Sequence, residues 1–330
     1  MTPRVAVVVV NLDGGEEIER ALEELRRGTT KPDRVIVVDN ASTDGSPARI
    51  AERFPEVELV PMGANAGFAA ANNHAVRRAE DCDLVALLNP DAFAEPRWLE
   101  ALLAAAAAHP DADAFASRLL LEGSDGVLDG TGDVLHVSGF AWRRDHGRPL
   151  AQAAAGAPGE VFSPCGAAAL YRRDAFLAAG GFDETWFCYL EDVDLGFRMR
   201  LRGGRCRYVP DSVVRHVGSS TSGRTSDFQI YHAQRNLVWT YAKDMPGVLA
   251  VLYLPQHLLV NLLMVAFYAA SGRPGVVLRA KRDALRGLPD VLRRRRTVQR
   301  ARAVPVRAVL GALARGRSAY TTGLGRARGA

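Results

Sequence analysis

The chain has 330 residues, enough for one large α/β domain with appendages, and its 48% hydrophobic content is ordinary for a globular protein. Its charge is uneven: residues 271–330 contain 16 Lys and Arg against two Asp, a net of +14, so residues 1–270 carry −9 of the overall +5. A basic tail predicts an anionic partner. The acidic body and the scarcity of aromatic residues in the tail argue against nucleic acid and favour a membrane surface.

Two further features concern the compartment. The four cysteines lie far apart with no close pair, which predicts reduced thiols rather than a disulfide framework or a zinc site. The apolar run at 5–10 is too short for the core of a signal peptide, has no small-residue cleavage site after it, and is typical of a first strand. We therefore expect the folded body to stay in the cytosol.

The first 110 residues alternate between apolar runs and segments with helical spacing. The predicted strands are 5–10, 34–38, 57–60 and 84–88, and the predicted helices are an amphipathic segment around Ile18, Leu22 and Leu25, then 67–79 and 96–108. This alternation predicts a parallel sheet with right-handed crossovers. Ligands bind such sheets at the carboxyl ends of the strands, and Asp39 and Asp91 lie there.

The second half of the chain is less regular. Residues 121–160 are rich in Gly, Ala and Asp, as in loops or a hairpin. We expect helices at 171–179 and 190–202, each ended by a pair of glycines, and a strand at 205–209. The sequence thus predicts one α/β domain over 1–240 and a helical extension over 241–330.

Two segments near the predicted strand ends could bind a nucleotide. Asp39 begins a polar run that forms either a turn with a helix cap or a site in which the carboxylate accepts the ring N–H of a uracil or thymine base. The run 63–73 opens a helix with small residues, which allow close approach of phosphate, although an ordinary capped helix has the same pattern.

A metal site and a base are the other candidates. Asp91 can supply a hard oxygen ligand to Mg²⁺ or Mn²⁺, and His216, after a strand-like run, is either a second ligand or a structural histidine. Glu191, Asp192 and Asp194 complement a helix dipole, but three acids in four positions also suit a general base. The aromatic residues before them, Trp186 included, form either an acceptor wall or core.

Together these motifs resemble the family 2 glycosyltransferases, especially the bacterial rhamnosyltransferase-like branch. The resemblance covers about residues 4–240. It depends on the motifs Val-Asp-Asn-Ala-Ser-Thr-Asp-Gly-Ser at 38–46, Asn-Ala-Gly-Phe at 65–68, Leu-Leu-Asn-Pro-Asp at 87–91, Gly-Gly-Phe-Asp-Glu at 180–184 and Glu-Asp-Val-Asp-Leu at 191–195. It implies the GT-A architecture, a nucleotide-binding α/β domain with a mostly parallel sheet flanked by helices, and inversion at the anomeric carbon.

The resemblance also implies roles for single residues. Asp39 would contact the base, Asp91 and His216 would hold a divalent cation, Mn²⁺ or Mg²⁺, and Asp192, beside Glu191, would be the catalytic base. Asn89 stands where the family usually has a carboxylate. Arg235 would help the leaving diphosphate, and Trp186 and Asp194 would face the acceptor. The candidate residues for binding the nucleotide-sugar are Asn11, Asp39, Asn40, Ser42, Asp44, Asn65, Gly67, Asn89, Asp91 and Arg235.

The function expected from this resemblance is transfer of one sugar, rhamnose or similar, from dTDP-rhamnose or a UDP-sugar to a hydroxyl of a saccharide or lipid-linked acceptor in cell-envelope polysaccharide synthesis. The sequence Gln234-Arg235-Asn236 departs from the Gln-x-x-Arg-Trp motif of processive synthases, which favours single addition. A sugar-nucleotide pyrophosphorylase would need a basic loop after the first strand, and residues 11–17 are acidic. An inactive membrane-bound saccharide-binding protein would not need Asp91, Asp192 and His216 together.

The apolar segment 247–270 is long enough to cross a bilayer, since about 20 apolar residues suffice. Its polar centre, with Pro255, His257 and Asn261, makes insertion marginal and favours a broken, interfacial helical hairpin. The arginine run 293–296 would then hold the protein at the cytoplasmic face of the membrane. The alternative is that 247–270 packs on the α/β domain and the tail is disordered.

Overall fold

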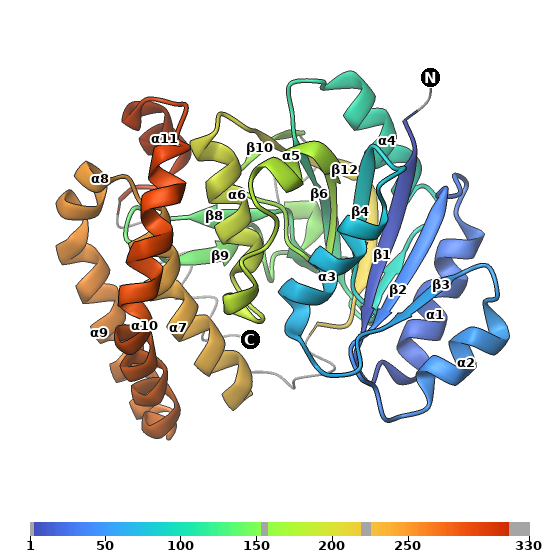
Figure 1. Cartoon of the computed structure of the whole chain (residues 1–330), viewed down its shortest axis with the longest axis horizontal. Helices are drawn as coiled ribbons and strands as arrows, with labels where there is room; N and C mark the ends of the chain where they lie inside the picture. The colour runs from blue at the N-terminus through green and yellow to red at the C-terminus, as the bar shows by residue number, and fades with distance from the viewer. Residues whose placement is uncertain (1–2, 153–157, 219–225, 317–330) are drawn as a thin grey trace.

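In a computed structural model, which describes residues 3–152, 158–218 and 226–316, the chain forms a sheet covered by helices, with a layer of long helices beside it (Figure 1). The predicted α/β architecture is confirmed. The last part of the predicted basic tail, 317–330, and residues 153–157 of the predicted loop region lie outside the described residues.

The first half of the sheet is parallel, as the alternation predicts. Its strands are β1 (Val5–Asn11), β2 (Arg34–Asp39), β3 (Glu58–Pro61) and β4 (Leu84–Leu88). The helices between and after them are α1 (Gly15–Arg27), α2 (Ser46–Arg53), α3 (Gly67–Arg78) and α4 (Trp98–Ala108). Only α2 is absent from the sequence-based prediction. Apolar residues on both faces of these strands are buried under the helices, which explains the continuous apolar runs.

The second half of the sheet is mixed, and it adds antiparallel strands to the mostly parallel sheet that the sequence predicts. The added strands are β5 (Ala92–Ala94), β6 (Ala114–Leu121), β7 (Leu128–Gly130), β10 (Gly159–Val161), β11 (Ala168–Arg172) and β12 (Cys206–His216). Strand β11 runs antiparallel between β4 and β6, and the sheet order is β10-β12-β6-β11-β4-β1-β2-β3. The strand predicted at 205–209 therefore continues to His216.

The helix predicted at 171–179 is wrong at its start. Tyr171 and Arg172 end β11, and the helix α5 covers Arg173–Ala178. The Tyr171 ring is fully buried on the sheet, where it packs against Phe176 and Phe182. Burial against the sheet thus overrides the helical spacing. The hairpin considered for 121–160 is present as β8 (Asp133–Leu135) paired with β9 (Ala141–Arg143).

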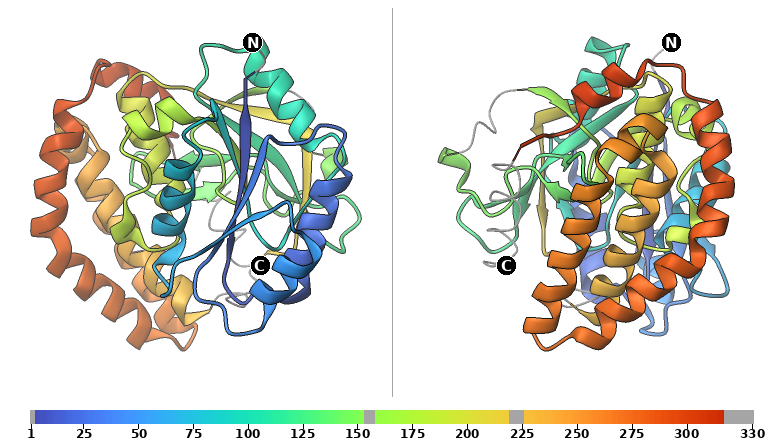
Figure 2. Two further views of the ribbon diagram at one scale, coloured as in Figure 1. Left: turned by 45° about the vertical axis from the view of Figure 1, so that its right-hand side comes forward. Right: turned by 90° about the vertical axis from the view of Figure 1, so that its left-hand side faces the viewer.

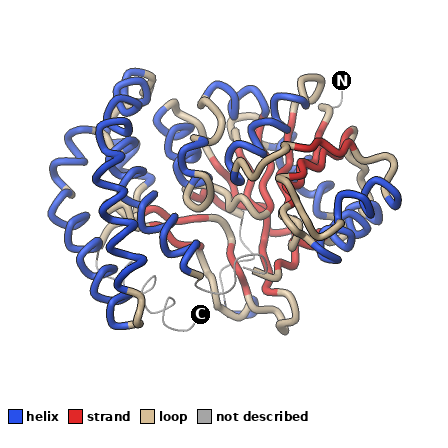
Figure 3. Tube along the Cα trace, turned by 60° about the horizontal axis from the view of Figure 1, so that its bottom comes forward, coloured by secondary structure: helices blue, strands red, loops and turns tan. Residues whose placement is uncertain are grey.

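The C-terminal third is a helical layer, which Figure 2 shows from its outer side and Figure 3 as helical tubes beside the strands. Its helices are α6 (Glu191–Leu201), α7 (Asp227–Asp244), α8 (Gly247–Leu252), α9 (Leu254–Ala270), α10 (Pro274–Arg300) and α11 (Val306–Ala312). The domain division expected at residue 240 falls inside α7. Helix α10 packs along α7, and the Trp239 indole N–H donates to the carbonyl of Ala284.

The end of the described chain returns to the hairpin. Ala314, just after α11, pairs with β8, because Val137 N–H donates to the Ala314 carbonyl and Ala314 N–H donates to the Leu135 carbonyl. The basic segment is therefore structured as far as the description extends, which differs from the disordered tail of the alternative interpretation.

The apolar segment 247–270 is broken between α8 and α9, beside Pro255, where the polar centre predicts a break. Among residues 3–152, 158–218 and 226–316, no helix combines the length and the hydropathy needed to span a bilayer.

Candidate active site

Polar side chains from the ends of β1 and β2 meet at the carboxyl edge of the sheet. Asn11 and Asp39 are register partners, and the Asn11 amide donates to Asp39 Oδ1 at 3.1 Å. The same amide nitrogen lies 3.0 Å from Ser42 Oγ and 2.8 Å from Ser46 Oγ. Asn11 is fully buried. It therefore holds Asp39 in place, instead of the direct nucleotide contact expected for it.

The loops after β2 and β3 are joined by the candidate nucleotide residues. Asn40 donates to Asn65 Oδ1 at 2.9 Å and accepts from the N–H of Ala66 at 2.8 Å. Asp44 accepts from the N–H of Gly15 at 2.8 Å, which ties the loop after β1 to the loop after β2. The structure thus brings these predicted residues together around Asp39, at the start of α3.

Gly67 opens α3 with a φ of +84°, and a Cβ there would lie 2.6 Å from the ring of Phe187. Both the conformation and the space require glycine. The start of α3 consequently packs directly against the segment that precedes α6.

The metal candidates face each other. The turn at Asn89 follows β4, and the pairing of β5 with β12 sets Ala92 opposite His216. His216 Nε2 lies 3.3 Å from Asp91 Oδ1, and both side chains are buried. Two cis ligands of an octahedral cation, each about 2.1 Å from it, lie roughly 3 Å apart, so the pair fits one divalent ion.

Other ligands would have to come from outside the pair. Within the described part of the chain, no group of three or more His, Cys, Asp and Glu side chains is arranged to hold a metal. Asn89 donates its backbone N–H to the Ala167 carbonyl at 2.9 Å. A cation on Asp91 and His216 would therefore take its remaining ligands from diphosphate oxygens and water, as Mg²⁺ sites for nucleotides commonly do.

A carboxylate absent from the sequence-based prediction orients His216. Asp129, on β7, lies 2.8 Å from His216 Nδ1 through Oδ2, and it also pairs with Arg143 and, at 3.1 Å, with His146. Burial lowers the pKa of His216, but the hydrogen bonds to Asp129 and Asp91 outweigh it and raise that pKa to about 9. Such a partner fixes which ring nitrogen faces a metal.

Asp192 is the partly exposed acid at the start of α6. Its Oδ2 accepts from the N–H of Gly166 at 2.9 Å and its Oδ1 from the N–H of Val193 at 2.8 Å. Burial raises the pKa of Asp192, while these N–H groups and the charge of Arg143 oppose the rise. Gly166 precedes the residue that receives the Asn89 N–H, so the base candidate lies next to the metal candidates.

Glu191 differs from its neighbour. Its side chain is 5% exposed, and its Oε2 has no hydrogen-bond partner among the described residues. Burial, then the charge of Asp192, raises the pKa of Glu191 well above its usual range. Asp192 is therefore the more accessible carboxylate of the two, and Glu191 is a buried acid beside it.

Two predicted site residues are held in the interior. The Trp186 side chain is fully buried and its N–H donates to Thr240 Oγ1 at 3.1 Å. Asp194 is fully buried and pairs with Arg198 at 2.6 Å and with Lys243. Neither has the open surface that an acceptor contact needs, so the acceptor role expected for Trp186 and Asp194 is corrected to a place in the core.

Arg235 also differs from expectation. Its guanidinium donates to the carbonyl of Thr185 at 3.1 Å and of Trp186 at 2.9 Å, and it stacks over the Trp239 ring at 4.3 Å. These contacts direct it to the protein backbone and away from a leaving diphosphate. A positive charge that does act on Asp192 is that of Arg143, which also acts on Asp129 and Asp133.

The segment before α6 is strained. Phe187, Tyr189 and Leu190 have φ values of 64°, 67° and 65°, in the left-handed region. For residues other than glycine, each such conformation costs of order 1–3 kcal/mol and persists where the surroundings enforce it.

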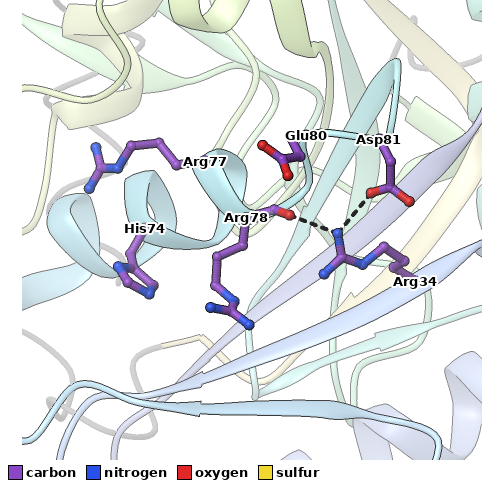
Figure 4. A pocket seen from close by; sticks show the side chains of 6 residues that line it. All are labelled: Arg34, His74, Arg77, Arg78, Glu80 and Asp81. Atoms are coloured by element: carbon purple, nitrogen blue, oxygen red, sulfur yellow. Dashed lines mark hydrogen bonds and ion pairs between the residues drawn. The ribbon is translucent and has the colours of Figure 1, made fainter.

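A pocket at the opposite edge of the sheet is not part of this site (Figure 4). Arg34 begins β2 and Arg78 ends α3, and the Arg34 guanidinium donates to the Arg78 carbonyl at 2.7 Å and to Asp81 at 2.8 Å. The pocket therefore lies at the amino ends of the strands, away from Asp39 and Asp91.

The chain belongs to the glycosyl transferase family 2, whose family model matches residues 5–178. It is a glycosyltransferase of the rhamnosyltransferase-like branch: an N-acetylglucosaminyl-diphospho-decaprenol L-rhamnosyltransferase of Mycobacterium tuberculosis is 33% identical over 291 residues, 79% of this chain and 94% of that protein. This membership favours a transferase over a pyrophosphorylase.

Solved structures confirm the GT-A type of fold. A mannosyltransferase from Pyrobaculum calidifontis in complex with GDP-Man and Mn²⁺ matches with a TM-score of 0.54 and 23% identity, over 94% of this chain and 87% of that one. TarS of S. aureus in complex with UDP matches with a TM-score of 0.52 and 17% identity, over 77% of this chain and 70% of that one.

Proposed function

We propose that the protein transfers one sugar, rhamnose or a similar one, from dTDP-rhamnose or a UDP-sugar to a hydroxyl of a lipid-linked saccharide in cell-envelope polysaccharide synthesis, with inversion at the anomeric carbon. The observation that carries the proposal is the partly exposed Asp192 carboxylate, which Gly166 and Ala167 connect to the Asn89 turn that leads to the Asp91–His216 pair. The name of the mycobacterial relative, which specifies a GlcNAc-diphospho-lipid acceptor and rhamnose, supports this choice of substrates.

In this mechanism Asp39 accepts the ring N–H of the base and Asn11 keeps its carboxylate aimed. Asp91 and His216 would hold Mn²⁺ or Mg²⁺, which when bound would stabilise negative charge on the leaving diphosphate. Asp192 takes the proton of the acceptor hydroxyl as that oxygen attacks from the face opposite the diphosphate. The positive charge of Arg143 helps Asp192 to stay ionised for this step.

The test is a transfer assay on the full chain. Purified protein is incubated with Mn²⁺, a short-chain polyprenyl-diphospho-GlcNAc and either dTDP-rhamnose or UDP-sugars, and products are identified by mass spectrometry. We expect one sugar to be added, and thermal stabilisation by dTDP or UDP that depends on Mn²⁺. Absence of both product and nucleotide-dependent stabilisation would refute the proposal.

We also propose that the protein sits on the cytoplasmic face of the membrane through α8 and α9. Helix α9 buries Val260 and Met264 against the rest of the protein, and large apolar side chains on its other side are exposed. The exposed apolar residues of the two helices are Val248, Val251, Leu252, Leu254, Leu258, Leu259, Leu262 and Leu263. Next to them α10 supplies arginines, so an apolar face with a cationic flank suits an anionic bilayer.

Vesicle flotation tests this placement. Replacing Val251, Leu258 and Leu262 together by Ser should reduce binding to vesicles containing phosphatidylglycerol, while Leu177→Ser, an exposed apolar control on α5, should leave it unchanged. Equal binding by the triple variant and the native protein would rule the face out. Binding to neutral vesicles should be weaker than to anionic ones, because each Arg near an anionic leaflet contributes about 1 kcal/mol.

A further inference from the structure

The backbone carbonyls of the segment before α6 accept hydrogen bonds from neighbouring helices. Asn236, on α7, is fully buried, and its amide nitrogen lies 3.0 Å from the carbonyl oxygens of Trp186 and Cys188 and 2.7 Å from that of Tyr189. An amide has two N–H donors, so three carbonyl oxygens share them. One side chain thus contacts the carbonyls on both sides of the left-handed Phe187.

Other groups complete the arrangement. Arg235 donates to Thr185 and Trp186 carbonyls and, through Nε, to Asn236 Oδ1 at 2.9 Å, which orients the Asn236 amide. The Phe187 carbonyl accepts from the N–H of Ala69 on α3 at 3.1 Å. All five carbonyls from Thr185 to Tyr189 therefore have donors on α7 or α3.

These contacts lie immediately before the reactive carboxylate. Leu190, the third left-handed residue, is the N-cap position of α6, and its carbonyl accepts from the N–H of Asp194. Only Glu191 stands between Leu190 and Asp192. The direction in which α6 leaves this segment therefore sets where the Asp192 carboxylate points.

From this geometry we infer that Asn236 is a positioning residue for glycosyl transfer: it keeps the strained segment 186–190 in the conformation that aims Asp192 at the acceptor. The inference rests on the proposed role of Asp192 as the base. Asn236→Ala would remove the hydrogen bonds that Asn236 donates to the partly buried carbonyls of Cys188 and Tyr189. The segment would then relax from its left-handed conformation and carry Asp192 away from the reacting oxygen.

The test is a double-mutant cycle on transfer to the short-chain GlcNAc acceptor. Asn236→Ala should lower kcat by roughly 10–100-fold, since a misplacement of about 1 Å can cost 10²-fold, with the donor KM within about twofold of native. In the Asp192→Asn background the same substitution should lower kcat no further, because there is no base left to misplace. Asn236→Ser, which keeps one donor, should lose less than Asn236→Ala.

A control on the same helix separates positioning from general destabilisation. Gln234 is buried on α7 but binds Lys281 of α10, so Gln234→Ala should lower the melting temperature while kcat stays native. Native kcat in both Asn236 variants, or losses that multiply in the Asp192→Asn background, would overturn the inference. Asp192→Asn alone tests the base, because an unchanged kcat in that variant refutes the proposed mechanism whatever the Asn236 variants do.

Discussion

Replacing Asp129 by Asn should weaken Mn²⁺ binding by roughly 10–100-fold, the usual cost of losing the partner of a metal-bound histidine. In free energy this is about 1.4–2.8 kcal/mol. Asn keeps the size of the side chain, so the loss comes from charge. The 2.8 Å contact from Asp129 to His216 Nδ1 is buried on both sides, where a charge-assisted hydrogen bond is strong. Without the carboxylate, nothing fixes His216 with Nε2 towards Asp91.

The measurement is isothermal titration of Mn²⁺ into the full chain with dTDP or UDP present, which reads metal affinity without turnover. Asp145→Asn is the matched control: Asp145 follows β9 and binds Thr131 and Arg148, with no contact to His216 among its hydrogen bonds and ion pairs. The control should bind Mn²⁺ like the native protein. A folded Asp129→Asn variant with native Mn²⁺ affinity would refute the role of Asp129 in orienting His216.

Three further predictions follow from the titrating groups. Asp192→Asn should lower kcat by roughly 10²–10⁴-fold with little change in donor KM, and a larger loss in Glu191→Gln would exchange their roles. Because His216 has a pKa of about 9 without metal and a ligand must be deprotonated, Mn²⁺ binding at pH 7 should release a proton, measured by titration in buffers of different ionisation enthalpy; no proton release would contradict this. Burial lowers the pKa of His257 to about 4, below its ordinary 6.5. As the pH falls, His257 is therefore protonated in the unfolded chain before it is protonated in the folded one. The contribution of His257 to stability is complete above pH 6.5 and falls as the pH drops towards 4. His257→Gln should therefore flatten the fall in melting temperature over this range, and an unchanged slope would count against the assignment.

The sequence predicted the site residues that can be recognised from their neighbours in the chain. Asp39 and Asp91 follow apolar runs, and the end of a buried parallel strand places such residues at one edge of the sheet. Asp129 could not be found this way, because its role depends on His216, 87 residues further along, and a single acid in a Gly-rich segment has no pattern of its own.

Helix α7 was missed for a related reason. It is covered on one side by α10 and on the other by the segment before α6. Its sequence therefore does not divide into one apolar face and one polar face. Without this helix, Trp186 was expected to contact the acceptor and Arg235 the leaving diphosphate. Thr240, the partner of Trp186, and Arg235 itself lie on that unpredicted helix.

The pairing of Ala314 with β8 has a consequence for synthesis. The hairpin of β8 and β9, which carries Arg143, leaves the ribosome long before its last partner is made. The N-terminal strands can pair early, as domains that fold during synthesis do. The pairing of β8, however, is completed only when residue 314 has been added. A nascent chain stalled before that point would hold the parallel strands and the hairpin but lack the last partner of β8.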